Sequence, residues 1–327
     1  MKLISPPKLK KGDWISVVAP SSSASLITSK NLDLAKRCLE GWGLKVVYGK
    51  HIFNKYRNSL EGIRGKLADL HTAFSDKRIS AVMSVIGGYS ANELLPYLNY
   101  HLFRENPKIF VGYSDTTVLQ NAIFEKSGLI TFSGPAFATL AQTQTPFEYE
   151  KDHLKHVLMN PERMSFVKPA KHWAEDAWWK NPKKPRQLHT SPGWRVIYPG
   201  KTRGVIVGGN LSSFLLLLGT PCAPSLRNKI IFLEEDPEMN LSMIQRSLVQ
   251  VSQNKEVNQL RGVIVGRFSS RVGLRPQWEV RLLKRLFRPN VILVSNVDFG
   301  HTNPMITFPV GGECEVDTAK SLIRFKY

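Results

Sequence analysis

Three short segments of this 327-residue chain end in side chains that together could hydrolyse an amide or ester bond. Ser114 supplies a hydroxyl, Glu234 a carboxylate and His301 an imidazole, and each follows an apolar run typical of a buried strand. A nucleophilic hydroxyl needs a base to take its proton and an acid to fix the tautomer of that base. The order serine, acid, histidine along the chain is one workable arrangement of such a triad.

Ser114 lies at a predicted strand-to-helix turn. The apolar run Ile109–Val111 precedes it, and the helical pattern 116–126 follows it. Segment 112–115 (GYSD) resembles a nucleophile elbow, in which a sharp turn presents the hydroxyl above a sheet. The N–H of Asp115, at the helix start, could stabilise an oxyanion. Serine, aspartate and threonine are also common helix N-caps, and the local sequence alone favours that simpler interpretation.

Two other turns carry candidate groups. Gly87 and Gly88 end the predicted strand 79–86, where glycines permit a positive φ and an exposed N–H that could donate to an oxyanion. A plain turn is the simpler local interpretation of this pair. His301 follows the buried run 291–294 in a polar turn, where an imidazole is accessible enough to act as a general base.

An acidic run follows another predicted strand, at 233–236 (LEED). Three adjacent acids could bind a metal ion or orient a histidine, although such runs are more often solvated strand ends. No histidine or cysteine lies nearby at the spacing of a zinc site. We therefore predict neither a metal nor a cofactor.

Strands and helices alternate through the first half of the chain, which indicates a mostly parallel, doubly wound sheet. Sites in such sheets lie at the carboxyl ends of strands, where the glycine pair and Ser114 are expected. The predicted strands are 14–18, 44–48, 79–86 and 108–111, and the predicted helices are 26–42, 59–74, 93–98 and 116–126.

Residues 166–203 differ from their surroundings in composition. This segment is rich in proline and lysine and holds four of the seven tryptophans, namely Trp173, Trp178, Trp179 and Trp194. So many exposed tryptophans would be costly, so we interpret the segment as a connecting loop that packs against the protein. The pattern beyond it is β-rich. We predict an N-terminal α/β domain (1–165), the connecting loop (166–203) and a C-terminal β-rich α/β domain (204–327).

The formal net charge of +19 favours anionic partners. The charge is spread along the chain without a nucleic-acid-binding signature, so nucleic-acid binding is a minor alternative. No apolar run reaches the roughly 18 residues of a membrane span, and the N-terminus lacks the apolar stretch of a secretory signal. The three cysteines are odd in number and far apart, which indicates buried thiols in a reducing compartment, and we expect a cytoplasmic protein.

Five segments resemble, in the right order, the signature blocks of the LD-carboxypeptidase serine peptidases. They are 84–96 (SVIGGYSANELLP), 108–117 (KIFVGYSDTT), 208–220 (GGNLSSFLLLLGT), 230–238 (IIFLEEDPE) and 297–312 (VDFGHTNPMITFPVGG), and the opening 12–20 (GDWISVVAP) also fits. The resemblance implies a flavodoxin-like N-terminal α/β domain and a β-rich C-terminal domain with the site between them. It also implies a homodimer.

The resemblance carries the family's catalytic roles to five positions: the nucleophile Ser114, the general base His301, the triad acid Glu234, and the oxyanion donors Gly88 and Asp115. The family commonly has Glu-Asp at the acid position, and this chain has two glutamates there. Glu235 therefore remains an alternative acid, and Gly87 is the alternative to Gly88.

Within the family, the chain is more similar to the microcin C immunity branch than to the murein tetrapeptide enzymes. Ile86 precedes the glycine pair as in that branch, where murein enzymes usually carry arginine, and the Trp-rich insertion and the segment Val263–Phe268 also fit. The branch cleaves an amide between an aspartyl residue and a nucleotide-like group, and insertion tryptophans stack on the base. The candidates here are Trp173, Trp178 and Trp179, although they could instead pack at a domain or dimer interface.

We therefore predict a serine carboxypeptidase or amidase that acts on a small anionic peptidyl-nucleotide. Murein tetrapeptide carboxypeptidase activity is the alternative.

Overall fold

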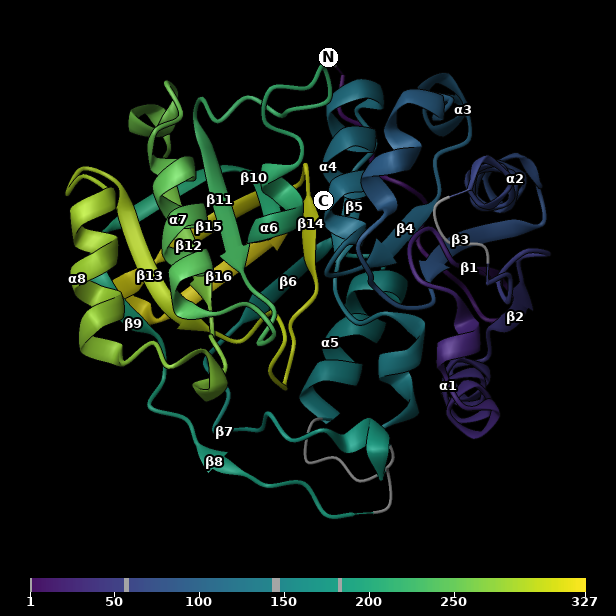
Figure 1. The fold of residues 1–327 in the computed structure, drawn as a ribbon, viewed down its shortest axis with the longest axis horizontal. Coiled ribbons are helices and arrows are strands. Elements are labelled where there is room, and N and C mark those ends of the chain that lie inside the picture. The colour runs from purple at the N-terminus through teal and green to yellow at the C-terminus, as the bar shows by residue number, and fades with distance from the viewer. Residues whose placement is uncertain (1, 56–58, 143–147, 182–183) are drawn as a thin grey trace.

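The computed structural model describes residues 2–55, 59–142, 148–181 and 184–327, and it contains two large sheets side by side (Figure 1). The first sheet has the strand order β14-β5-β4-β3-β1-β2. Strands β1 to β5 are mutually parallel in the order 2-1-3-4-5, which is the flavodoxin-like doubly wound arrangement. This sheet comprises β1 (Trp14–Val18), β2 (Lys45–Tyr48), β3 (Ile79–Ser84), β4 (Ile109–Gly112), β5 (Thr131–Ser133) and β14 (Phe308–Val310).

The helices of this half connect the parallel strands, as the doubly wound pattern predicts. They are α1 (Ser29–Gly41), α2 (Leu60–Ser75), α3 (Tyr100–Glu105) and α4 (Thr116–Ser127), whereas α5 (Glu148–Met159) follows the last parallel strand and leads to the second sheet. The predicted helix 26–42 begins later, because Thr28 accepts a hydrogen bond from the N–H of Asn31 and so caps α1. The predicted helix at 93–98 is a 3-10 segment, Ala91–Tyr97, with Pro96 inside it.

The second sheet has eight strands in the order β6-β16-β15-β10-β11-β12-β13-β9. Strands β10 to β13 are parallel, and the remaining pairings are antiparallel. Its strands are β6 (Met164–Val167), β9 (Arg195–Tyr198), β10 (Lys201–Asn210), β11 (Lys229–Glu234), β12 (Gly262–Gly266), β13 (Ile292–Val297), β15 (Glu313–Asp317) and β16 (Leu322–Lys326). The accompanying helices are α6 (Leu211–Leu215), α7 (Leu241–Ser252) and α8 (Pro276–Leu286). The predicted pairing of a flavodoxin-like α/β part with a second, β-rich part is confirmed.

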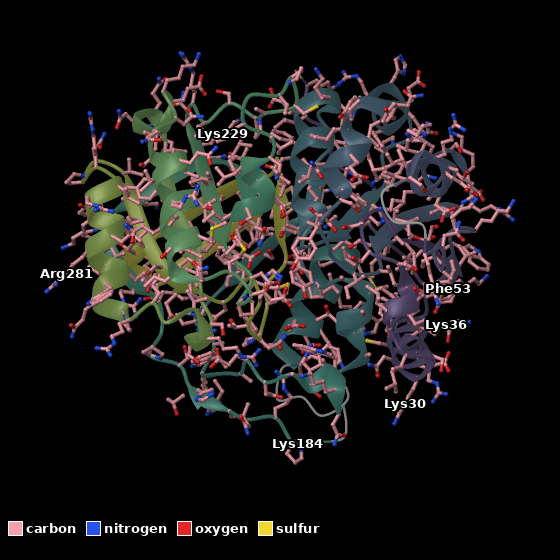
Figure 2. All side chains as sticks on the ribbon, in the orientation of Figure 1. Lys30, Lys36, Phe53, Lys184, Lys229 and Arg281 are labelled. Atoms are coloured by element: carbon pink, nitrogen blue, oxygen red, sulfur yellow. The ribbon has the colours of Figure 1, made fainter. Side chains whose placement is uncertain are left out.

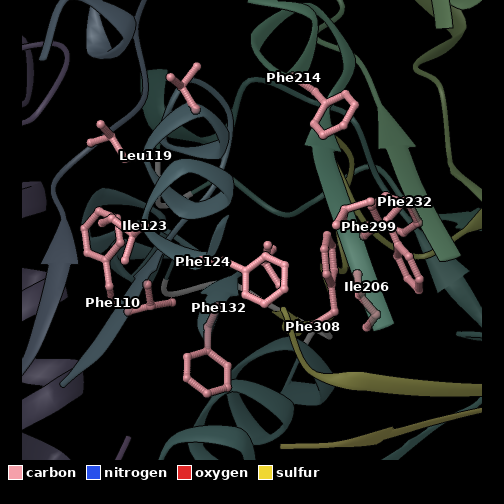
Figure 3. Close-up of a cluster of buried hydrophobic side chains, with 14 of the residues drawn as sticks. Phe110, Leu119, Ile123, Phe124, Phe132, Ile206, Phe214, Phe232, Phe299 and Phe308 are labelled. Carbon is pink, nitrogen blue, oxygen red and sulfur yellow. The ribbon is translucent and has the colours of Figure 1, made fainter. Parts of the chain in front are cut away.

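Strand β14 links the two halves. Its backbone pairs antiparallel with β5, with Phe308 opposite Ser133, so a C-terminal segment completes the first sheet. The ring of Phe308 also packs against Phe232 and Phe299, with centroids 4.7 and 5.4 Å away (Figure 3). The backbone of β14 therefore belongs to the first sheet, whereas the side chain of Phe308 packs among aromatic rings of the second half.

Helix α4 lies against β10 through buried polar contacts. The side-chain amide of Asn121 donates to the carbonyl of Gly208 and accepts from its N–H, both at 2.9 Å. Thr117 Oγ1 accepts from the N–H of Asn210 at 2.9 Å. These bonds fix α4, the helix that follows Ser114, against β10. Strand β10 in turn pairs with β11, which ends at Glu234.

The positive charge is distributed over the surface. Figure 2 shows Lys30, Lys184 and Arg281 at the outer edge of the molecule, on separate elements. In the described ranges, no helix is long and apolar enough to cross a membrane. All three cysteines are free thiols, and Cys222 and Cys314 are buried.

Candidate active site

Ser114 occupies the sharp turn between β4 and α4. Its φ is +60°, a left-handed conformation that side-chain-bearing residues seldom adopt and that often marks a functional site. The N-cap of α4 is Asp115, so Ser114 lies one residue outside the cap position. Ser114 is therefore not the cap of α4, and its strained strand-to-helix turn resembles a nucleophile elbow.

His301 and Glu234 form a close buried pair. His301 Nδ1 lies 2.7 Å from Glu234 Oε2, and the Glu234 side chain is almost fully enclosed at the end of β11. Gly300 permits this approach, because a Cβ at that position would lie 2.6 Å from Glu234 Oε2. The contact holds the ring with Nε2 turned away from Glu234, which is the orientation a general base needs.

The ring of His301 lies beside the strand-to-helix turn of Ser114. Its centroid is 5.1 Å from that of Tyr113, the residue before Ser114. The end of β11 and the segment after β13 therefore meet the turn that follows β4. The structure thus pairs Glu234 with His301 and places this pair beside the turn that carries Ser114, although the three residues lie far apart in the sequence.

Glu235 serves a different part of the structure. Its carboxylate accepts from Asn210 Nδ2 at 2.9 Å and from the N–H and hydroxyl of Ser212 at 3.0 and 2.5 Å. It therefore connects the end of β11 to the start of α6. Of the two glutamates, Glu234 alone forms a hydrogen bond with His301 within the described residues.

Asp236, the last residue of the acidic run 233–236, also lies against His301. Its Oδ2 lies 3.1 Å from His301 Nε2. Burial lowers the pKa of His301, but Glu234, Asp236 and Glu235 outweigh burial and raise it to about 9. The acidic run was the only sign of Asp236 in the sequence, and such a run does not reveal which way the Asp236 side chain points.

The glycine pair lies directly against the Ser114 turn. A Cβ on Gly87 would lie 2.8 Å from both Cβ and Oγ of Ser114. Gly88 has a φ of +148°. In the part of the chain that the structure describes, neither the N–H of Gly88 nor that of Asp115 donates to a protein acceptor.

The insertion reaches the segment that carries His301. Ala174 and Asn303 exchange two backbone hydrogen bonds of 2.9 Å, and Arg186 donates to Asn303 Oδ1 at 3.0 Å. Ala174 directly follows β7 (His172–Trp173), which pairs antiparallel with β8 (His189–Thr190) in a two-stranded ribbon.

The three candidate tryptophans of the insertion have different environments. Trp173 lies between His189, with ring centroids 4.7 Å apart, and the guanidinium of Arg267, 5.2 Å from its centroid. Trp178 is half-buried and meets Trp179 edge to face, whereas Trp179 itself is 52% exposed. Trp179 is therefore the member with the most surface to offer a ligand.

Both halves of the chain match models of one known protein family. A model of the LD-carboxypeptidase N-terminal domain matches residues 15–134, and one of the LD-carboxypeptidase C-terminal domain matches residues 203–316. A protein of Treponema pallidum (strain Nichols) that bears the name of a carboxypeptidase is 33% identical over 316 residues, 96% of this chain and 93% of that protein. The microcin C7 self-immunity protein MccF of Escherichia coli is 28% identical, covering 94% of this chain and 92% of its own. The murein tetrapeptide carboxypeptidase of Pseudomonas aeruginosa is 26% identical over 78% of this chain and 76% of its own.

Solved structures agree in fold over nearly the whole chain. An MccF-like protein from Bacillus anthracis str. Ames superposes with a TM-score of 0.93 at 34% identity, covering 99% of both chains. MccF in complex with aspartyl sulfamoyl adenosine superposes with a TM-score of 0.88 at 26% identity, covering 98% of both chains. The chain belongs to the LD-carboxypeptidase family and is a serine-type hydrolase.

Proposed function

We propose that this enzyme hydrolyses the amide of a small anionic peptidyl-nucleotide by means of Ser114, His301 and Glu234. The observation that carries the proposal is the 2.7 Å contact between His301 Nδ1 and Glu234, beside the strained turn that presents Ser114. A hydroxyl, a base and an orienting carboxylate are the groups that acyl transfer through a serine requires.

In the proposed reaction, neutral His301 takes the Ser114 proton on Nε2 as Oγ bonds to the substrate carbonyl carbon. The carbonyl oxygen becomes an oxyanion that accepts from the N–H groups of Gly88 and Asp115, and one such donor typically contributes roughly 3–4 kcal/mol to lowering the barrier. His301 then returns the proton to the leaving amine as the C–N bond breaks. Water, deprotonated by His301, then attacks the acyl carbon, and His301 returns this proton to Ser114 Oγ as the ester bond breaks, which releases the carboxylic acid and regenerates the free enzyme.

The nucleotide part of the proposal rests on the insertion and on relatives. MccF has been solved with aspartyl sulfamoyl adenosine and, as a mutant with one tryptophan changed to phenylalanine, with adenosine monophosphate. Trp179 has the exposed face that stacking on a base requires, and the half-buried ring of Trp178 lies beside it. A strongly basic protein also attracts anionic substrates.

Murein tetrapeptide carboxypeptidase activity is the second candidate, because the Pseudomonas aeruginosa relative carries that name. We also propose that the enzyme acts in the cytoplasm as a homodimer. Three free cysteine thiols suit a reducing compartment.

The decisive experiment offers aspartyl sulfamoyl adenosine and a murein tetrapeptide to the same preparation and follows the released group of each. We expect turnover of the nucleotide substrate, and a fall in kcat on the order of 10⁴-fold or more in S114A, with the Tm unchanged. Full activity in S114A would overturn the mechanism. Release of the terminal D-amino acid from the tetrapeptide alone would favour the second candidate.

A further inference from the structure

The carboxylate of Asp115 is turned away from its own helix. Asp115 is the N-cap of α4 and is only 2% exposed, yet its side chain makes no capping hydrogen bond. Its Oδ2 instead accepts from Ser21 Oγ at 2.5 Å and from the N–H of Ala91 at 2.8 Å. An N-cap aspartate ordinarily accepts from the first turn of its helix, so this one has a different partner set that needs an explanation.

Both partners belong to the segments that enclose the glycine pair. Ala91 begins the 3-10 segment that follows Gly88, and the N–H of Ser90 points to Ser21 Oγ at 3.4 Å. On the other side, the N–H of Ser22 donates to the carbonyl of Gly87 at 3.1 Å. The loop 87–90 is therefore attached at both ends to residues 21 and 22. Asp115 accepts from Ser21 on one side and from Ala91, the residue directly after the loop, on the other.

Contact between the loop and the serines is close. A Cβ on Gly88 would lie 2.3 Å from Ser21 Oγ and from Ser22 Oγ, so the backbone of Gly88 rests on these hydroxyls. Any movement of Ser21 would change the position of Gly88.

We propose that Asp115 is a positioning residue that builds both halves of the oxyanion hole. Its N–H is one donor, and its carboxylate, through Ser21 and Ala91, fixes the loop that carries the other donor, the N–H of Gly88. This inference rests on the proposed function, because it assumes that these two N–H groups receive the oxyanion at Ser114.

Hydrogen bonding is the property of this carboxylate that Ser21 and Ala91 require, and its charge also attracts Lys66, which donates to Ser90 Oγ at 2.8 Å. A negative charge close to a developing oxyanion raises the energy of the transition state. An acceptor oxygen is nevertheless needed, because Ser21 and Ala91 would otherwise bury unsatisfied donors. Asparagine provides the oxygen without the charge, so the hypothesis predicts rescue by D115N and not by D115A.

The test compares D115A, D115N and S21A with D69A. Asp69 is a matched control, because it is also buried in this half and its carboxylate also accepts from another segment, at His51 N and Nδ1. The substrate-independent readout is the rate at which a fluorophosphonate probe labels Ser114, since the phosphonyl oxygen occupies the oxyanion hole. The second readout is kcat and KM on whichever substrate the wild type turns over, and hydrogen exchange over residues 85–92 reports on the loop.

We expect D115A to lower the labelling rate and kcat by roughly 10- to 100-fold, a part of what loss of a whole donor costs, with KM changed less than about 3-fold. S21A should show a smaller fall, and D115N should recover most of the rate. Exchange over residues 85–92 should rise in D115A and S21A. D69A should lower the Tm while leaving the labelling rate and this exchange unchanged.

Wild-type labelling rates in both D115A and S21A would overturn the inference. So would an equal fall in the labelling rate of D115A and D69A when the two variants lose the same amount of Tm. S21A and D115N keep the test valid if D115A does not fold. Failure of the proposed function has a different signature, which is full turnover in S114A. Labelling that is lost in S114A but unaffected by D115A and S21A would contradict only the role of Asp115.

Discussion

His301 Nε2 lies 3.1 Å from Asp236 Oδ2, while Nδ1 of the same ring lies 2.7 Å from Glu234 Oε2. An imidazole between two carboxylates is stabilised as the imidazolium ion, in agreement with the pKa of His301 being raised to about 9. Nε2 is also the nitrogen that takes the Ser114 proton in the proposed mechanism. Asp236 therefore competes with Ser114 for His301.

The first prediction concerns D236N. A general base works in its neutral form, and a raised pKa keeps His301 protonated, so kcat/KM should rise with pH up to about pH 9. Removing the charge of Asp236 lowers the pKa of His301, which increases the neutral fraction at lower pH. The rising limb of the pH profile should move to lower pH, with a gain in kcat/KM of roughly 10-fold at pH 7.

E238Q is the matched control for this change. Glu238 lies in the same loop but accepts from Tyr89, and it is not among the acids that raise the pKa of His301. Its pH profile should match that of the wild type. An unmoved limb in D236N would mean that Asp236 does not hold His301 in the free enzyme.

The two neighbouring glutamates should separate in kinetics and stability. E234Q removes the charge that stabilises the imidazolium and disturbs the tautomer of His301, so kcat should fall by roughly 10²- to 10⁴-fold. E235Q should change kcat by less than about 10-fold, but lower the Tm, because Glu235 accepts several hydrogen bonds at the start of α6. Steady-state kinetics and thermal unfolding of both variants check this, and the reverse pattern would make Glu235 the triad acid.

Removal of Trp179 should affect nucleotide substrates alone. W179A is expected to raise KM for a peptidyl-nucleotide by roughly 10-fold, since stacking on a base contributes about 1–3 kcal/mol, with little change in kcat. Turnover of a murein tetrapeptide should not change. W278A, which removes another half-exposed tryptophan from the distant helix α8, should leave both substrates unaffected. Equal KM in W179A and wild type would exclude this ring from base recognition.

A side chain at Gly88 should disable the site without unfolding the protein. G88A would place a Cβ 2.3 Å from two serine hydroxyls at a φ of +148°, so the donor loop must shift. We expect kcat to fall by about 10²-fold or more. Gly12 also has a positive φ, but no atom lies within 4 Å of its Cβ position, so G12A reports the conformational cost alone. Similar kcat in the two variants would argue against Gly88 as a donor.

The neighbourhood of Glu234 and His301 was predictable because β11 and β13 belong to one parallel sheet and so end at the same edge, whereas Ser114 follows a strand of the other sheet. Apolar runs before all three residues mark strand ends, and only the resemblance to the family's segments linked Ser114 to the other two. The direction of the Asp236 side chain was not predictable, because it depends on the loop after β11. Nor does the short apolar run before Phe308 indicate which sheet β14 joins, since that depends on tertiary packing.

The composition of residues 166–203 predicts a loop, but part of this segment is a β-strand. The prolines and lysines around Arg195–Tyr198 indicate a loop, whereas these residues form the edge strand β9 beside β13. Edge strands tolerate such neighbours, because only one side of the backbone must pair.

Because β14 completes the first sheet, the chain cannot be cut between its halves without opening that sheet. A fragment that ends before the second sheet would leave β5 as an open sheet edge and would expose Phe132, which is buried in the full chain. Unpaired apolar edges are templates for aggregation. The halves should therefore be insoluble when expressed separately, and domains exchanged between relatives should assemble only if β14 travels with the sheet it completes. Recombination within this fold is constrained by a strand of three residues.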